Sequence, residues 1–241
     1  NEILEKMIQQ IGKEKILFNQ PVFKIPSENI IITPGYEIQF EKLINCAGTS
    51  AVKLAKQMGA AKDYELLPFK GIYKVCSEKL SKQINAHIYP VPDLRNPFLG
   101  IHFTKAISGK VYIGPTAMPA LGPENYQFLE GLSTETLSIL YKNARLFIEN
   151  KAFRAVALTE PKNYIHSHFI NQARALVHHL DDTQISNCPK VGIRPQLINW
   201  KTKQLEMDFK IEKTKTAVHV LNAISPAFTA APAFAKLVVN D

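Results

Sequence analysis

The sequence has few cysteines, and they are not arranged as a disulfide framework or a zinc site. Its three cysteines, Cys46, Cys76 and Cys188, are far apart and include no C-x-x-C pair. Disulfide-rich domains and structural zinc sites use larger, closely spaced sets of thiols. We therefore expect three free thiols and a reducing compartment, and we predict no metal site.

Long apolar runs are also absent. No run approaches the roughly 20 residues that a membrane-spanning helix needs, and no signal peptide is visible. We therefore predict a cytoplasmic location, with a peripheral association with the inner membrane left open. The first residue is Asn1, already inside a helical pattern, so we expect the sequence to describe part of a longer protein.

The positive charge is not gathered into a basic segment. The formal net charge is +8, but the lysines are scattered, and no run of five or more basic residues occurs. Proteins that bind nucleic acids concentrate their lysines and arginines on one surface, often with aromatic residues between them. The pattern indicates a solvated surface, and nucleic acid is not an expected partner.

The N-terminal part predicts a helix followed by a small β meander. Apolar residues recur at helical spacing over residues 2–11, and Gly12 is a typical helix stop. Short β-prone runs separated by proline and glycine then follow over residues 15–40.

A strand, a turn of small residues and a helix come next. The apolar run 43–46 leads into Ala47 and Gly48, after which Thr49 or Ser50 can cap a helix. Such a turn lets a backbone approach a ligand and directs helix N–H groups at it, which suits a phosphate. An Ala-Gly turn also occurs for packing reasons alone, so both interpretations stay open.

The remainder alternates between β-rich and helical segments. The segments IYKV, HIYPV, LGIHFT and KVYIG lie between residues 67 and 117, separated by turn residues, and predict an antiparallel sheet. Two amphipathic helices follow, the first capped by Ser133 and the second beginning after Pro161. The runs KVGIRPQL, QLEMDFKI and AVHVLN then predict further strands, and FTAAPAFAKLVV predicts a final helix.

Several of these segments together resemble a known enzyme family. The β-rich stretch 67–117, INCAG, GIRPQ and HVLNAISPAFTAAPAFAKLV are similar to the FAD-dependent D-amino-acid oxidase family, in its L-2-hydroxyglutarate oxidase/dehydrogenase branch. The resemblance is densest over residues 45–126 and 191–239, and thinnest over 132–187. Members of the family open with a glycine-rich strand, turn and helix that bind FAD, and this sequence contains no such motif.

The resemblance implies an α/β fold with two parts. One is a partial FAD-binding, Rossmann-like lobe, and the other is an α+β substrate domain with an antiparallel sheet and helices. We expect residues 1–62 to belong to the FAD-binding lobe, residues 63–187 to form the substrate domain, and residues 188–241 to return to the FAD-binding lobe.

The resemblance also implies contacts to FAD. INCAG matches the family's second dinucleotide-contact motif, and the N-terminus of the final helix is expected to face the flavin, where unpaired N–H groups stabilise negative charge. An ordinary capped terminal helix is the alternative. The residues expected at the cofactor are Cys46, Ala47, Gly48, Asn222, Ser225, Pro226 and Ala227.

For the substrate, the resemblance implies cations that bind carboxylates. Arg194 matches the family's substrate-facing arginine, and its planar guanidinium suits a carboxylate; an interdomain salt bridge is the alternative. Lys70 and Lys105 stand where the family pattern favours arginine, and either can meet a distal carboxylate. Tyr89 is a candidate hydroxyl donor, with core packing as the alternative.

Two histidines on predicted strands are candidates for the catalytic base. His102 and His219 lie in matched motifs, and histidine titrates near neutral pH. The alternative for each is a hydrogen-bonded packing residue.

The resemblance therefore implies an FAD-dependent oxidoreductase that oxidises a 2-hydroxy acid, with L-2-hydroxyglutarate converted to 2-oxoglutarate as the leading interpretation. This chain would supply only part of the enzyme and would bind FAD weakly or not at all by itself. The expected partners are the small 2-hydroxy acid and an electron acceptor. Two alternatives remain: an amino-acid or glycerol-3-phosphate oxidoreductase of the same fold, and a non-catalytic remnant that does not bind FAD.

Overall fold

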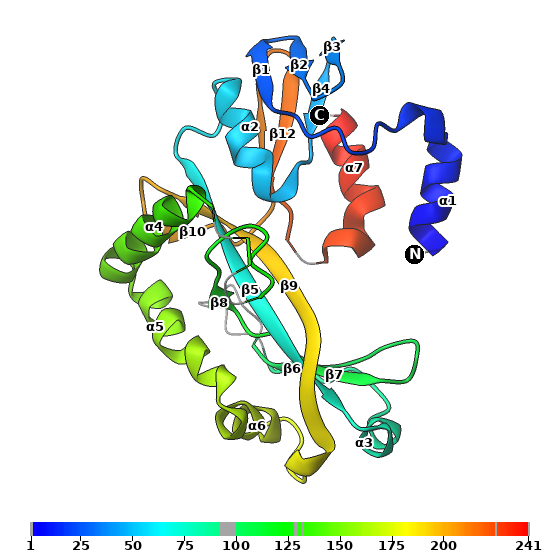
Figure 1. Ribbon diagram of the computed structural model, residues 1–241, viewed down its shortest axis with the longest axis vertical. Coiled ribbons are helices and arrows are strands. Elements are labelled where there is room, and N and C mark those ends of the chain that lie inside the picture. The colour runs from blue at the N-terminus through cyan, green and yellow to red at the C-terminus, as the bar shows by residue number, and fades with distance from the viewer. Residues whose placement is uncertain (1, 92–99, 128–129, 132, 225, 241) are drawn as a thin grey trace.

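Two long strands form the spine of the larger of the two lobes. The computed structural model describes residues 2–91, 100–127, 130–131, 133–224 and 226–240. The strands β5 (Tyr64–Cys76) and β9 (Ile185–Asn199) run side by side through the larger lobe, and the smaller lobe lies beyond the end that carries Tyr64 and Asn199 (Figure 1).

The larger lobe is built on a six-stranded antiparallel sheet. Its order is β10-β9-β5-β7-β6, and β8 also pairs with β5. The pairing of β5 with β9 extends from Tyr64 opposite Asn199 to Cys76 opposite Ile185, with a register irregularity near Tyr73. Irregularities of this kind increase the twist of a sheet, and this sheet is strongly curled (Figure 1). The shorter strands are β6 (His102–Lys105), β7 (Val111–Gly114), β8 (Met118–Pro119) and β10 (Gln204–Leu205).

Four helices cover this sheet and close its hydrophobic core. The side chain of Ser77 accepts the Leu80 N–H at the start of α3, and the side chain of Asn150 accepts the Phe153 N–H at the start of α5. Each of these caps satisfies an amide that the helix leaves unpaired. The helices are α3 (Glu78–Gln83), α4 (Glu135–Glu149), α5 (Lys151–Thr159) and α6 (His166–Arg174).

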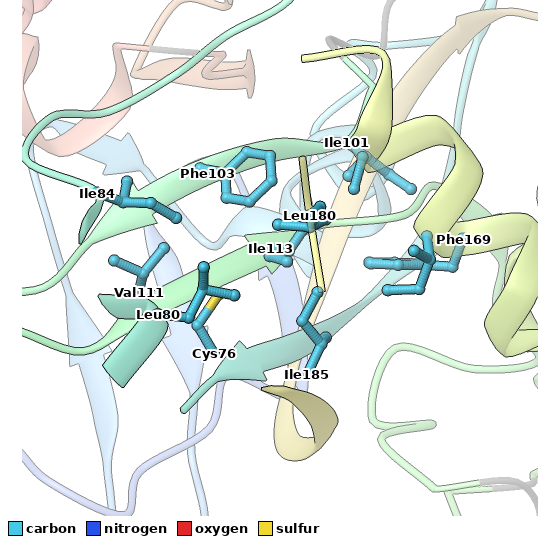
Figure 2. Packing of buried hydrophobic residues seen from close by; sticks show 12 residues of the cluster. Cys76, Leu80, Ile84, Ile101, Phe103, Val111, Ile113, Phe169, Leu180 and Ile185 are labelled. Atoms are coloured by element: carbon cyan, nitrogen blue, oxygen red, sulfur yellow. The ribbon is translucent and has the colours of Figure 1, made fainter. Parts of the chain in front are cut away.

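The largest core cluster joins α3 and α6 to one face of the sheet. Phe103 and Val111 are fully buried, and Phe169 of α6 packs against the same cluster (Figure 2). A second cluster brings Phe153 of α5 against Phe69 of β5, with the two rings edge to face at a centroid distance of 6.1 Å. Burial of such aromatic side chains accounts for much of the stability of a core.

The smaller lobe contains a short parallel pair of strands. In the order β11-β12-β4, β4 runs parallel to β12, so the carboxyl ends of both strands lie at the same edge. A separate meander, β1-β2-β3, and the helices α1, α2 and α7 complete the lobe (Figure 1). Its elements are α1 (Glu2–Ile11), β1 (Lys24–Ser27), β2 (Ile30–Ile32), β3 (Glu37–Gln39), β4 (Leu43–Asn45), α2 (Ala51–Gln57), β11 (Lys210–Lys213), β12 (Ala217–Asn222) and α7 (Ala231–Asn240).

The predicted fold class is confirmed: the chain is a mixed α/β structure with a curled antiparallel sheet. The N-terminal helix, the meander and the strand–turn–helix unit lie where the sequence predicted them. The division into residues 1–62, 63–187 and 188–241 stays a prediction, and β9 continues across the boundary at residue 188.

Three local predictions were wrong. Residues 15–20 form no strand, because a short 3₁₀ turn at Lys13–Lys15 and the left-handed Asn19 interrupt the extended run. In HIYPV, only Ile88 pairs, through an isolated bridge to Phe103. The two predicted helices are in fact α4, α5 and α6, since Asn150 ends α4 and caps α5.

Three general features of the described residues bear on function. The three cysteines are unpaired. No helix in the described ranges is long and apolar enough to cross a bilayer, and no group of three or more His, Cys, Asp or Glu side chains there is placed to hold a metal ion.

Candidate active site

A cavity of about 430 Å³ lies on the face of the large sheet that is turned away from the α3–α6 core cluster. The alternation of side chains along β6 and β7 explains its position. Ile101, Phe103 and Ile113 are buried in the core, so His102, which lies between two of them, points to the opposite face. Strands β5, β6 and β9 and the segments that flank β6 and β7 therefore supply the lining.

Arg194 places a positive charge in this cavity. It lies on β9 opposite Phe69, two residues after Gly192, and both Arg194 and Gly192 line the cavity. Burial lowers the pKa of the Arg194 guanidinium from its ordinary value, but arginine keeps its charge at neutral pH. A planar cation in a cavity of this kind is suited to bind a carboxylate through two parallel hydrogen bonds.

His102 supplies a neutral imidazole to the same cavity. Its Nδ1 lies 2.9 Å from the carbonyl oxygen of Gly100. A carbonyl oxygen only accepts hydrogen bonds, so Nδ1 carries the hydrogen and Nε2 keeps the lone pair. Burial is the main cause that lowers the pKa of His102 below its ordinary value. His102 is therefore held in the tautomer and the charge state of a general base.

Tyr89 lies against His102 at the mouth of the cavity. The two rings are 4.7 Å apart between centroids, at an interplanar angle of 34°, and Tyr89 also lines the cavity. About half of its surface, 51%, is exposed. The structure thus brings together three of the residues predicted at the substrate: His102, Tyr89 and Arg194.

The two predicted lysines lie elsewhere. Lys70 is buried, and its Nζ donates to Oδ1 of Asn125 at 3.1 Å and to the carbonyl of Gln127 at 3.3 Å. Burial lowers the pKa of Lys70. Lys105 donates to the carbonyl of Ile84 at 2.7 Å, just beyond the end of α3, where a cation is favoured by the helix dipole. Neither lysine lines the cavity.

His219 is likewise outside the cavity. It is completely buried in β12, and its Nδ1 accepts a hydrogen bond from Nδ2 of Asn45 on the adjacent β4 at 3.1 Å. Burial lowers the pKa of His219, which keeps the ring neutral. Its Nε2 has no hydrogen-bond partner among the described residues. The geometry indicates that His219 joins two strands rather than contacting a substrate in this cavity.

The residues predicted at the cofactor gather at the carboxyl edge of β4 and β12. Asn45 Oδ1 accepts the Ala47 N–H at 3.2 Å and so shapes the turn after β4. Gly48 has φ 55°, and a Cβ placed on it would meet nothing within 4 Å, so its backbone is open to a ligand. Asn222 ends β12, and its Nδ2 donates to the carbonyl of Asp208 at 2.7 Å.

A second cavity of about 440 Å³ joins the two turns. Cys46 after β4 and Ala227 before α7 both line it, together with mainly apolar side chains. Burial raises the pKa of the Cys46 thiol, so it stays protonated. Pro226 directly precedes Ala227 at the start of the turn before α7, while the predicted Ser225 lies outside the described residues. This cavity shares no lining residue with the one that holds Arg194.

The turn after β4 and the turn before α7 fit one side of a flavin nucleotide. Ligands of α/β folds bind beyond the carboxyl ends of parallel strands, where open backbone can approach them, and the turn at Gly48 meets that condition. Thr49 and Ser50 line a third cavity together with Pro195, the residue after Arg194. The turn after β4 therefore lies next to β9, the strand that carries Arg194.

Sequence reasoning missed Gly192, the glycine that leaves space in the first cavity. A Cβ on Gly192 would meet no atom within 4 Å, whereas a Cβ on Gly71 would lie 2.6 Å from the Cβ of Pro115. Gly192 thus borders empty space, while Gly71 is packed. The alternation of side chains along β9 was a signal for Gly192, because residues two apart on a strand share a face.

Replacing Gly192 with leucine is expected to fill the cavity without damaging the fold. The KM for the substrate should rise at least about tenfold, while the free energy of unfolding should change by less than about 1 kcal/mol. Gly71→Ala is the contrasting variant and should lose about 1–3 kcal/mol of stability through its contact with Pro115. Steady-state kinetics and urea unfolding measure both effects, and a wild-type KM for Gly192→Leu would show that the cavity is not the substrate site.

Comparisons with known proteins identify the family of the chain. The family model described as FAD dependent oxidoreductase (DAO) matches residues 5–240. An L-2-hydroxyglutarate dehydrogenase of Salmonella houtenae is 33% identical over 198 residues, covering 82% of this chain and 46% of that protein. Another, of Escherichia coli strain K12, is 30% identical over 233 residues, covering 95% of this chain and 54% of that protein. The chain thus spans about half the length of these curated relatives.

A solved structure shows the same fold. The L-alpha-glycerophosphate oxidase from Mycoplasma pneumoniae, with FAD bound, superposes with a TM-score of 0.58 at 18% sequence identity. The superposition covers 92% of this chain and 49% of that one.

Proposed function

The chain belongs to the family of FAD-dependent oxidoreductases, and from that premise we propose that it binds a 2-hydroxy acid, specifically L-2-hydroxyglutarate, for oxidation to 2-oxoglutarate. The observation that carries the proposal is the shared cavity of Arg194 and His102. It combines a cation for a carboxylate with a neutral base for a hydroxyl group.

Each residue has a defined task in this reaction. Oxidation of a secondary alcohol removes a hydride from the carbon and a proton from the oxygen. Arg194 holds the carboxylate next to the reacting carbon, and His102 accepts the hydroxyl proton on Nε2. Tyr89 packs on the imidazole and limits its movement.

FAD, when bound, supplies the acceptor for the hydride. The residues that would hold it are the backbone of Cys46, Ala47 and Gly48 and the turn at Pro226 and Ala227. Open backbone at Gly48 and the common position of both turns at one strand edge support this assignment. The sequence has no glycine-rich strand, turn and helix of the kind that binds a pyrophosphate.

The choice of substrate is supported by the relatives. Those of about 30% identity over most of the chain are named L-2-hydroxyglutarate dehydrogenases. A dicarboxylate needs a cation at each end, whereas an amino acid needs one cation and an acceptor for its amine. The cavity supplies one such cation, Arg194, and the neutral His102 as an acceptor for the hydroxyl proton.

A substrate panel tests the proposal. The FAD-loaded enzyme that contains this chain should be assayed with an artificial electron acceptor and L-2-hydroxyglutarate, D-2-hydroxyglutarate, glycine or glycerol 3-phosphate. We expect the highest kcat/KM for L-2-hydroxyglutarate, at least about 100-fold above the D enantiomer because the base and the clamp define one face of the α-carbon. A preference for glycine or glycerol 3-phosphate would contradict the proposal.

A further inference from the structure

A second cation lies on the same face of β9 as Arg194. Lys190 precedes Gly192 by two residues and Arg194 by four on this strand. Side chains of a strand alternate, and four residues span about 13 Å, so Lys190 and Arg194 stand at opposite ends of one row. Gly192 lies between them and carries no side chain into the space above.

Two tyrosine rings hold the ammonium of Lys190. Its Nζ lies 4.7 Å from the ring centroid of Tyr73 and 4.8 Å from that of Tyr112. Tyr73 lines the cavity. Tyr112 lies on β7 opposite Thr104, two residues before Gly114, which pairs with His102. The alternation along β6 and β7 therefore turns Tyr112 and His102 to the same face of the sheet.

No acidic side chain among the described residues neutralises the charge of Lys190. Within the part of the chain that the structure describes, no carboxylate forms an ion pair with it, and its contacts are the two rings and the Cys188 sulfur that accepts its backbone N–H. Cation–π contacts position an ammonium group but leave its hydrogen-bond donors able to bind an anion. Lys190 is thus a positioned cation next to a cavity that already holds Arg194.

Three other lysines of the sheet are held by contacts away from the cavity. Lys70 binds the side chain of Asn125, and Lys105 binds the carbonyl of Ile84. Lys74 donates to Oδ1 of Asn187 at 2.7 Å and lies over the ring of Phe169, in the core cluster. Unlike these three lysines, Lys190 lies on the face of the sheet that carries the cavity.

We propose that Lys190 binds the distal carboxylate of a 2-hydroxy dicarboxylate whose first carboxylate lies on Arg194. The carbon chain of the substrate then crosses the open space above Gly192. The inference rests on the proposed function, because it assigns the second carboxylate of the same substrate. It makes Lys190 the residue that separates diacids from monoacids.

Replacement of Lys190 by methionine in the FAD-loaded enzyme tests this assignment. The two substrates are L-2-hydroxyglutarate and L-2-hydroxyvalerate, which has the same carbon chain without the distal carboxylate. The KM for L-2-hydroxyglutarate should rise about tenfold or more with little change in kcat, whereas kcat/KM for L-2-hydroxyvalerate should stay within about twofold. Lys190→Arg keeps the charge and should recover most of the preference for the diacid.

Lys110→Met is the matched control. Lys110 is an exposed lysine directly before β7 that does not line the cavity, so its loss should leave the kinetics with both substrates unchanged. Lys190→Gln provides a second variant with a polar side chain, and thermal unfolding checks that each variant is folded.

The outcomes separate the two proposals. If the wild-type enzyme oxidises neither hydroxy acid, the proposed function is wrong and the inference falls with it. If the wild-type enzyme prefers L-2-hydroxyglutarate and both Lys190→Met and Lys190→Gln keep that preference, the function stands and the role of Lys190 is wrong. An equal loss for both substrates would also overturn the inference.

Discussion

Replacing Arg194 with methionine is expected to reduce kcat/KM for L-2-hydroxyglutarate by about 100- to 1000-fold. Two charge-assisted hydrogen bonds to a carboxylate are lost in this variant, and each contributes about 1.5–3 kcal/mol. Methionine keeps an unbranched apolar stem of similar length, so the cavity wall is preserved while the charge is removed. Steady-state kinetics of the FAD-loaded enzyme measure the effect.

Two further variants identify the cause of the reduced kcat/KM. Arg194→Lys keeps the charge but not the planar pair of donors, so its kcat/KM should lie between those of the wild type and Arg194→Met. Arg145→Met removes a partly exposed arginine on α4 that pairs with Glu149 and should leave the kinetics unchanged. A kcat/KM for Arg194→Met within about threefold of the wild type would remove Arg194 from the site.

Patterns of neighbouring residues correctly predicted helices, strands and turns that depend only on nearby parts of the chain. The apolar spacing over residues 2–11 corresponds to α1, and the apolar run with its Ala-Gly turn corresponds to β4 and the turn before α2. The resemblance to the enzyme family, rather than a local pattern, selected Arg194 and His102, and the structure places both in one cavity. Apolar spacing and turn residues depend on neighbours along the chain, which explains why the predictions of α1, β4 and the turn before α2 agree with the structure.

Contacts between residues far apart in the sequence explain why Lys70 and His219 lie elsewhere than the sequence predicted. Lys70 is held by Asn125, which lies 55 positions away, and His219 is bound to Asn45, 174 positions away. Nothing beside these residues in the sequence indicates such partners. From the sequence alone, a lysine in a β-rich motif is predicted to be free to bind a ligand. The fold shows that its ammonium group donates to another part of the chain instead.

The same reasoning explains why Lys190 was not selected. Its position on the cavity face follows from the alternation along β9, but its two aromatic partners come from β5 and β7. Only the pairing of three strands brings them together. The position of the Lys190 ammonium therefore depends on the whole sheet and could not be predicted from one segment of the sequence.

Replacing His102 with asparagine is expected to lower kcat by about 100- to 10,000-fold, the usual contribution of a general base. The asparagine Nδ2 can keep the donation to the Gly100 carbonyl that Nδ1 of histidine makes at 2.9 Å, while the basic Nε2 is lost. The variant therefore separates the loss of the base from a change of local structure. His178→Asn, which changes an exposed histidine beyond the end of α6, should leave the rate unaltered.

The pH dependence gives the decisive readout for His102. Protonated imidazole cannot accept the hydroxyl proton, so kcat/KM of the wild type should fall as the pH drops through the pKa of His102. Because burial lowers this pKa, the fall should be centred below the ordinary histidine value of about 6.5, and the rate should be level above it. His102→Asn should lose this acidic limb altogether, since no titrating base remains at that position. If the limb persists unchanged in His102→Asn, another group takes the proton, and the role of His102 is reduced to packing against Tyr89.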